Sequence, residues 1–291
     1  MVTTPVLELP SYWPKTGLQS ESETYSFTTF DSRKATATFA SISDTHENVA
    51  RIDTLMSRID WGTLDFLVHT GDAFDGVTSE TQVWERWLTP LIRTGIRHGT
   101  PLLFARGNHE TRGPFSRELA RHVPVEEGRF YYARDIGPVH LLVIDTGEDK
   151  PDSTQVYAQL NRLEAYRNEE LAWFKRHSAT APRARSAPFR VMVMHQPTFG
   201  WGWRSSPASD SARAGWIAAA NAAGVDLVIA GHNHRFSLTQ PGAHGNNYPV
   251  LVVGQDQVAK VHATATELRV QVIGKAGEEV TAFTLPVKRR R

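Results

Sequence analysis

The chain has 291 residues, a length that one large α/β domain can accommodate, so length alone requires no division into two domains. Its 32 Lys and Arg residues balance 31 Asp and Glu residues, and the net charge of +1 excludes a general attraction to nucleic acid or an anionic membrane. The absence of cysteine excludes disulfides, thiolate zinc sites and cysteine nucleophiles, which leaves His, Asp, Glu and Asn as metal ligands.

The first 33 residues are rich in Pro, Ser, Thr and Glu and show no sustained hydrophobic period. We therefore expect residues 1–33 to form an extended arm that lies on the domain or remains from an upstream linker. The start of the chain has neither the basic nor the apolar segment of a secretory signal. We expect a soluble protein that is cytoplasmic, or exported with its signal already removed.

From Ala35 onward, short β-prone runs alternate with amphipathic helical stretches. This alternation predicts an α/β domain over residues 34–287, with the first six runs in one sheet system. Trp84 and Trp87 recur at helical spacing with Leu88 and Leu91 and are expected in the core. The runs cover residues 35–43, 65–70, 101–105, 139–145, 189–195 and 226–230, and helices are expected at 49–59, 80–97, 157–177 and 211–223.

After Gly231 the helical signal ends and four β-prone runs follow, at residues 248–255, 258–266, 268–274 and 279–287. Gly and polar residues separate these runs, as in consecutive antiparallel strands, so we expect a second sheet. The weakly polar stretch 215–231 is interrupted by polar residues and predicts a helix feeding a buried strand, not a membrane span. Residues 288–291 form a basic tail, either solvated or a tether for phosphate or nucleic acid.

Polar motifs directly follow five of the first six runs, and ligand sites in α/β sheets form at the carboxyl ends of strands. Each motif is weak by itself, because Asp-x-His arises by chance and an Asp after Gly is a common turn residue. Five successive motifs of one chemistry indicate a metal site, since such polar groups are otherwise costly to bring together. The motif residues are Asp44 and His46; Asp72; Asn108 and His109; His195; His232 and His234.

In this order, the motifs resemble those of the calcineurin-like metallophosphoesterase superfamily, and the likeness covers about residues 35–261. The resemblance implies a four-layer α/β/β/α sandwich that binds two metal ions, Mn, Fe or Zn, with Asp72 as a bridging ligand. The first ion would be bound by Asp44, His46, Asp72 and His234. The second would be bound by Asp72, Asn108, His195 and His232.

Hydrolysis of a phosphate ester needs a hydroxide, a neutralised phosphoryl oxygen and a protonated leaving group. The two metals supply the first two through a bridging hydroxide that attacks phosphorus in line, and His109 is expected to protonate the leaving alkoxide. The expected substrate is a small phosphate monoester or diester. A strict phosphodiesterase of the cyclic-nucleotide or glycerophosphodiester type is an alternative, and a non-catalytic binding scaffold is a remote one.

No basic groove or run of Lys and Arg interleaved with aromatic residues accompanies the motifs. We therefore expect no nucleic-acid partner and no membrane partner. The sequence leaves the oligomeric state open.

Two departures distinguish the chain from purple acid phosphatases, which it otherwise resembles. Those enzymes carry an iron-binding Tyr three positions after the bridging Asp, where this chain has Asp75, so we expect no purple chromophore. Asp75 could orient a metal-binding histidine, enter the metal shell or cap a turn. Glu110 and Arg112 could orient His109 or meet substrate, and Glu110 could instead cap a helix.

The second departure is the loop after His195, which lacks the histidines that purple acid phosphatases tend to carry there. Arg204 in this loop could grip a non-reacting phosphate oxygen or lie on the surface. Three aromatic residues could form a wall for the substrate or fold back over the sheet edge. They are Phe199, Trp201 and Trp203.

Overall fold

Two six-stranded sheets form the centre of the protein, in a computed structural model that describes residues 3–21, 24, 26–95, 99–155, 158–197 and 207–288. The first sheet has the order β14-β13-β12-β3-β4-β5. Its parallel strands are β3 (Ala37–Ile42), β4 (Phe66–His69) and β5 (Leu102–Phe104). Antiparallel strands extend it: β12 (Gln257–Ala263), β13 (Glu267–Gly274) and β14 (Glu279–Pro286).

The second sheet has the order β10-β11-β9-β8-β7-β6. Its four central strands are parallel: β7 (Val139–Ile144), β8 (Phe189–Met194), β9 (Leu227–Ala230) and β11 (Val250–Val252). One antiparallel strand closes each edge: β6 (Tyr132–Ile136) and β10 (Ser237–Thr239).

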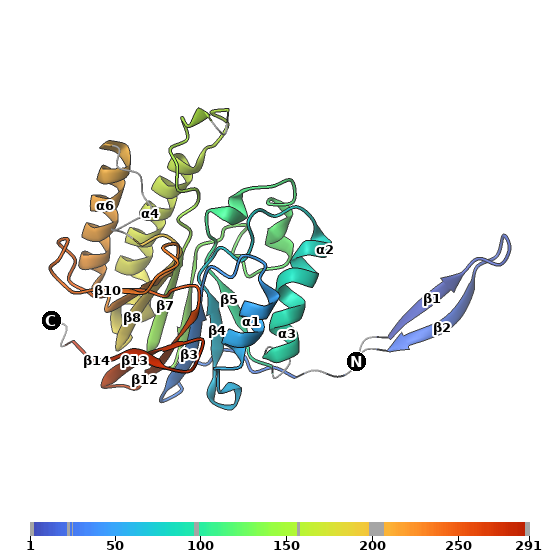
Figure 1. The fold of residues 1–291 in the computed structure, drawn as a ribbon, viewed down its shortest axis with the longest axis horizontal. Coiled ribbons are helices and arrows are strands. Elements are labelled where there is room, and N and C mark those ends of the chain that lie inside the picture. Colours follow the sequence, from blue (N-terminus) through green and yellow to red (C-terminus); the bar gives the residue numbers. More distant parts are fainter. Residues whose placement is uncertain are drawn as a thin grey trace.

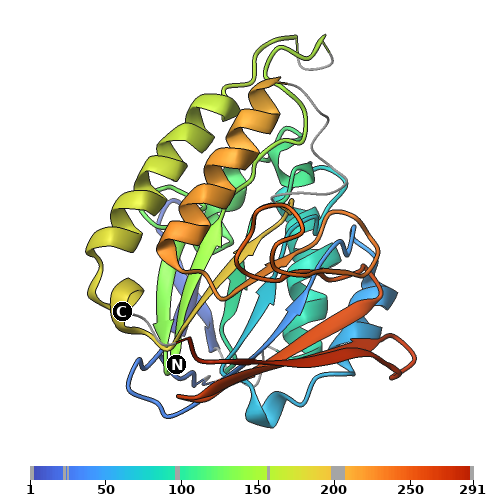
Figure 2. The same ribbon diagram turned by 90° about the vertical axis from the view of Figure 1, so that its left-hand side faces the viewer.

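Helices cover the outer face of each sheet (Figure 1). The first sheet is covered by α1 (Val49–Met56), α2 (Glu80–Val83), the π-helix η2 (Trp84–Leu88) and α3 (Thr89–Thr94). The second is covered by α4 (Leu163–Thr180) and α6 (Pro207–Ala223), which lie side by side in Figure 2. Short helices complete the fold: α5 (Pro182–Ser186) and the 3-10 turns η1 (Trp61–Thr63), η4 (His109–Thr111) and η5 (Glu118–Arg121).

In the described part of the chain, three hydrophobic cores lie between the four layers. Along β3, Phe39 faces the core between the sheets whereas Ala40 faces the core under α1 and α3. Along β7, Leu141 faces the core between the sheets and Leu142 faces the core under α4 and α6. This alternation follows from the two-residue period of a strand, and it confirms the predicted α/β/β/α sandwich.

The predicted division of strands between sheets is wrong. The first six runs do not form one sheet system, because three belong to the first sheet and three to the second. The four late strands are also divided, since β11 pairs with β9 whereas β12 pairs with β3. Strands buried on both faces are near-continuous apolar runs, so their sequences carry little information about which strand lies beside them.

The helix containing Trp84 also differs from the prediction. Trp87 and Leu91 are buried, but Trp84 is 43% exposed. At the start of the π-helix η2, the Trp84 ring instead packs edge to face on the His122 ring, with ring centres 6.0 Å apart.

Residues 3–21 of the expected N-terminal arm form a hairpin. β1 (Thr3–Glu8) pairs antiparallel with β2 (Lys15–Glu21), and Figure 1 shows this hairpin standing away from the sandwich. Its exposed side chains include Tyr12 and Trp13. The pairing rests on backbone hydrogen bonds, which require no hydrophobic period in the sequence.

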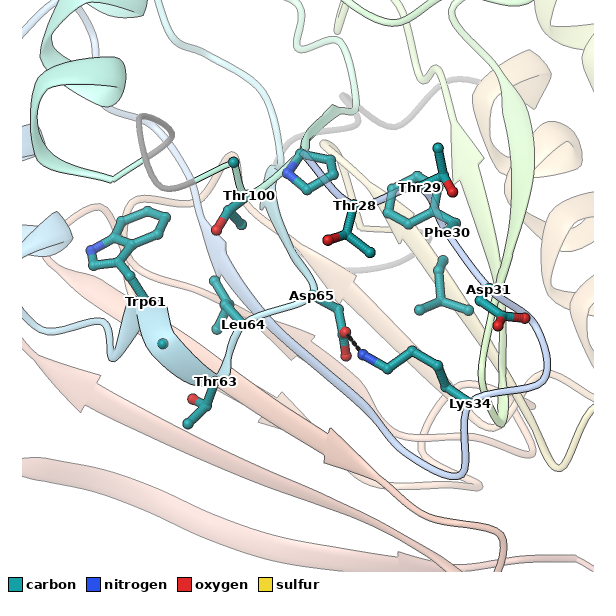
Figure 3. A pocket seen from close by; sticks show the side chains of 14 residues that line it. Thr28, Thr29, Phe30, Asp31, Lys34, Trp61, Thr63, Leu64, Asp65 and Thr100 are labelled. Carbon is teal, nitrogen blue, oxygen red and sulfur yellow. Dashed lines mark hydrogen bonds and ion pairs between the residues drawn. The ribbon is translucent and has the colours of Figure 1, made fainter. Parts of the chain in front are cut away.

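The arm joins the sandwich through residues 28–34, and residues 28–31 and Lys34 line a cavity of about 460 Å³ (Figure 3). Phe30 packs edge to face on Phe66 with ring centres 5.8 Å apart, and Lys34 forms an ion pair with Asp65. This cavity lies at the amino ends of β4 and β5, the edge opposite the polar motifs. The packed part of the chain therefore begins before residue 34.

The start of the basic tail is docked on the domain and not solvated throughout. The ammonium group of Lys288 lies 3.6 Å from a carboxylate oxygen of Asp226 and 3.2 Å from the carbonyl oxygen of Asn247. Residues 289–291 lie outside the described part of the chain. Among the described residues, no helix has the length and apolar character needed to cross a bilayer.

Candidate metal centre

The loops after β3, β4 and β9 bring a first group of four side chains together. The potential ligand atoms of Asp44, His46, Asp72 and His234 all lie within 4.8 Å of one another. Nε2 of His46 is 3.1 Å from Nε2 of His234, which in turn is 3.4 Å from Oδ1 of Asp44. These are the four residues expected around the first ion.

A second group forms beside the first and shares Asp72. The ligand atoms of Asp72, His195 and His232 also lie within 4.8 Å of one another. Nε2 of His195 is 3.0 Å from Oδ2 of Asp72, and the side-chain oxygen of Asn108 is 3.1 Å from Nε2 of His195 and 3.0 Å from Nδ1 of His232. The structure therefore places Asp72 between the two groups.

The spacing of these atoms fits metal ions. Two imidazole nitrogens whose lone pairs converge at 3.1 Å, as in His46 and His234, repel each other unless a proton or cation lies between them. A metal with nitrogen ligands at about 2.1 Å sets neighbouring ligand atoms roughly 3.0–3.4 Å apart. A carboxylate shared by two such groups suits two metals about 3.5–4 Å apart.

Hydrogen bonds fix the orientation of two of the histidines. Nδ1 of His46 lies 2.8 Å from Oδ1 of Asp75, and Nδ1 of His195 lies 2.7 Å from the carbonyl oxygen of Thr70. Because a carboxylate and a carbonyl can only accept, each Nδ1 donates, and in the neutral ring Nε2 keeps its lone pair toward the centre. Asp75 thus has the contact of a residue that orients a metal ligand.

The backbone at the centre is strained. Five of the seven expected ligands have a positive φ, which costs of order 1–3 kcal/mol each. Backbone bonds hold this conformation, including those from the Asp44 N–H to the Gly71 carbonyl (3.0 Å) and from the His46 N–H to the Asp72 carbonyl (3.1 Å). This backbone conformation turns side chains from separate loops toward one point. The five ligands are Asp44 (53°), His46 (45°), Asp72 (54°), His232 (71°) and His234 (58°).

Two glycines permit the close approach of these loops. Gly71 has φ +89°, and a Cβ there would lie 2.6 Å from Nδ1 of His195. A Cβ at Gly231 would collide with the Ser43 hydroxyl and lie 2.6 Å from a carboxylate oxygen of Asp44. A side chain at either position would push a ligand away from the centre.

Glu110 is fully buried and accepts hydrogen bonds from four backbone N–H groups. One oxygen accepts from Asp72 (2.9 Å) and Gly107 (2.7 Å), the other from Ala73 (2.7 Å) and Phe74 (3.2 Å). Burial and the Asp72 carboxylate raise the pKa of Glu110 to about 7, although a cation beside Asp72 would offset the second cause. Glu110 thus holds the backbone of the bridging ligand, and it does not orient the His109 ring or meet substrate.

His109 lies beside the centre. Its backbone N–H donates to Oδ1 of Asp72 at 3.0 Å, and its Nδ1 donates to the carbonyl oxygen of Asp75 at 2.9 Å. Nε2 is the ring nitrogen on the side of the centre, 3.9 Å from Oδ2 of Asp72. His109 also forms a third close group with His46 and Asp75.

A family model described as calcineurin-like phosphoesterase matches residues 37–236. The chain belongs to the calcineurin-like phosphoesterase family. It is accordingly a phosphoesterase, a hydrolase of phosphate esters. A comparison with curated protein sequences gives no match.

Solved structures share the fold of this phosphoesterase at low sequence identity. A purple acid phosphatase from yellow lupin seeds is 14% identical with a TM-score of 0.70, over 93% of this chain but 57% of the lupin chain. GAP50, described as an anchor in the inner membrane complex of Plasmodium, is 14% identical with a TM-score of 0.66, covering 89% of this chain and 91% of its own. A dimetal phosphatase from Danio rerio is 13% identical with a TM-score of 0.59, over 87% and 99%.

One supporting pair was not anticipated from the sequence of the phosphoesterase. The guanidinium of Arg106, just before the Asn108 loop, donates to both carboxylate oxygens of Asp145, at 2.6 and 3.2 Å, and lies 4.2 Å from the ring centre of Phe130. Asp145 follows β7, the run to whose end no motif was assigned. The acidic residue at the end of that strand was the feature of the sequence that could have indicated this pair.

The loop with the expected substrate contacts lies outside the described residues. It contains Phe199, Trp201, Trp203 and Arg204. Their roles remain predictions.

Metal binding to the phosphoesterase should be coupled to proton release. Burial alone lowers the pKa of His195, but the carboxylates of Asp72 and Asp44 outweigh it and raise the pKa to about 10. In the metal-free protein His195 is thus protonated at pH 7, where its charge stabilises the fold, and this stabilisation is lost as the pH rises through about 10. A metal must displace this proton, so affinity should increase as the pH rises from 7 toward 10.

Calorimetric titration of the metal-free protein with Zn²⁺ or Mn²⁺, in two buffers of different ionisation enthalpy, measures this release. We expect about one proton from His195 per chain, and less release from His195→Asn. An affinity independent of pH over this range would contradict the prediction.

Proposed function

We propose that this phosphoesterase hydrolyses small phosphate monoesters, diesters or both through two metal ions. The observation that carries the proposal is the position of Asp72, whose carboxylate belongs to both groups of ligand atoms. The set of oxygen and imidazole donors suits Mn, Fe or Zn. The proposed ligands are Asp44, His46, Asp72 and His234 for one ion, and Asp72, Asn108, His195 and His232 for the other.

When bound, two metals supply a water of lowered pKa as nucleophile and offset the charge of the phosphoryl oxygens. The side chains of the protein prepare the site for this chemistry. Asp75 and the Thr70 carbonyl fix the imidazoles of His46 and His195 before substrate arrives. His109, with Nδ1 bonded to the Asp75 carbonyl, directs Nε2 toward the centre, where the doubly protonated ring can give its Nε2 proton to the leaving oxygen and keep the proton on Nδ1.

Replacing His109 with Ala should impair poor leaving groups most. An alkoxide needs a proton as it leaves whereas nitrophenolate does not, so we expect a loss of about 100-fold for an alkyl phosphate and a much smaller loss for nitrophenyl phosphate. Steady-state kinetics on both substrates, with elemental analysis to show that the metals are retained, measure the effect. His262→Ala, at an exposed strand position, is the control. Equal losses on both substrates would exclude His109 as the general acid.

A substrate panel tests the proposed function itself. The protein is loaded with Mn²⁺, Zn²⁺ or Fe²⁺ and assayed with nitrophenyl monoester, diester and phosphonate substrates. We expect hydrolysis that depends on metal, with two metals per chain by elemental analysis. Activity on diesters alone would favour the strict phosphodiesterase. A fully loaded protein that hydrolyses none of them would overturn the proposal in favour of a binding scaffold.

A further inference from the structure

Two carboxylates from the loop after β7 hold the side chain of Arg112. Its Nε donates to one oxygen of Glu148 at 2.9 Å, and its Nη2 donates to the other at 2.7 Å. Nη2 also donates to Oδ1 of Asp149 at 3.2 Å. Such a two-point pair with a planar guanidinium fixes the orientation of the arginine as well as its position.

The held guanidinium lies beside the metal centre. Its third nitrogen, Nη1, is 3.3 Å from Nε2 of His109, the ring nitrogen that lies 3.9 Å from Oδ2 of Asp72. The Arg112 side chain is 27% exposed, whereas that of Glu148 is 1% exposed. The cation is therefore partly exposed and lies against His109, while the carboxylate that orients it is enclosed.

The loop that supplies the carboxylates is itself fixed. Arg167 of α4 donates to the carbonyl oxygen of Glu148 at 2.9 Å and to that of Thr146 at 3.3 Å. Lys150 lies 2.7 Å from Oδ1 of Asp149, so two cations face the two carboxylates and the cluster has no net negative charge. An anion approaching Arg112 thus meets no excess of negative charge from this clamp.

We propose that Arg112 binds the non-reacting oxygens of the substrate phosphoryl group and gives the enzyme a preference for monoesters over diesters. The inference rests on the proposed function and names its substrate class. A monoester carries close to two negative charges near pH 7 and a diester one, so a fixed guanidinium stabilises the monoester more. A monoester also presents more free oxygens to the donors of the guanidinium.

The first test compares Arg112→Lys with the wild type, because Lys keeps the charge but cannot reproduce the fork of donors. A second variant, Arg112→Met combined with Glu148→Gln, removes the cation without leaving a buried carboxylate unpaired. Arg134→Met is a matched control. Arg134 lies on β6, its side chain is 30% exposed, and it forms an ion pair with Glu126 at 2.6 Å. Melting temperatures of all variants show whether they fold.

We expect the double variant to lose about 100-fold in kcat/KM for nitrophenyl phosphate and only a few-fold for bis(nitrophenyl) phosphate, with Arg112→Lys between it and the wild type. The affinity of the metal-loaded protein for inorganic phosphate, measured by calorimetry, should fall about tenfold. Equal losses on both esters with unchanged phosphate affinity would overturn the inference. If the wild type hydrolyses neither ester, the proposed function fails, and phosphate affinity still decides the role of Arg112.

Discussion

Asp72→Asn should reduce kcat/KM for phosphate esters by about 10³-fold or more, which corresponds to the several kcal/mol that metal ions contribute to the transition state. Asp72 is the only described side chain that belongs to both main groups of ligand atoms, so its loss weakens both sites together. Asn has nearly the same shape as Asp but carries no charge and binds poorly between two cations. Steady-state kinetics and metal content by elemental analysis measure the outcome.

The matched control for this variant is Asp256→Asn. Asp256 forms partly exposed ion pairs with Arg51 and Lys275 and belongs to neither group of ligand atoms. The control should keep both metals and most of the activity. If Asp72→Asn retained two metals and wild-type turnover, the bridging assignment would be wrong and the two-metal centre would need another carboxylate.

Glu110→Gln should lower the free energy of unfolding by about 4 kcal/mol, because two buried N–H donors would each lose an acceptor at about 1–3 kcal/mol apiece. Glutamine keeps one acceptor oxygen, and its NH₂ group would face two of the four backbone donors that Glu110 now satisfies. The loop that carries Asp72 should loosen, so metal affinity should also decrease.

Urea unfolding of the metal-free protein measures the stability, and calorimetry measures the metal affinity. Glu85→Gln, at an exposed position of η2, is the control for the same chemical change without burial. Unchanged stability and metal affinity in Glu110→Gln would show that the four amide contacts contribute nothing to the site.

The buried network around the ligands depends on residues that have no distinctive spacing. Arg106 and Asp145 are 39 positions apart, and Arg112 and Glu148 are 36 apart. Nothing in either local sequence indicates the partner, because the pairing requires a loop of the first sheet to meet a loop of the second. The orienting contact from Asp75 to His46 was one of three alternatives open in the sequence, and only the geometry distinguishes among them.

Strand partners show the same dependence on packing. The sequence places strands within a few residues of β3, β4, β7, β8 and β9, since each is a short apolar run bounded by polar or turn residues. It does not indicate that β11 joins β9 or that β12 joins β3. It also missed β6 and β10, short edge strands that lack a clear alternating pattern.

The sequence by itself determined the family, the four-layer class and the residue types available for the centre. These features can be inferred from short stretches of sequence, because each motif directly follows a strand and short-range geometry fixes the positions of its residues. The tertiary structure decided the rest: the division of strands between sheets, the anchoring of Asp72 by Glu110, and the fixing of Arg112 beside His109. Those features arise where segments distant in the chain pack together. The free energy that stabilises them comes from the contacts between the segments, so neither segment indicates them by itself.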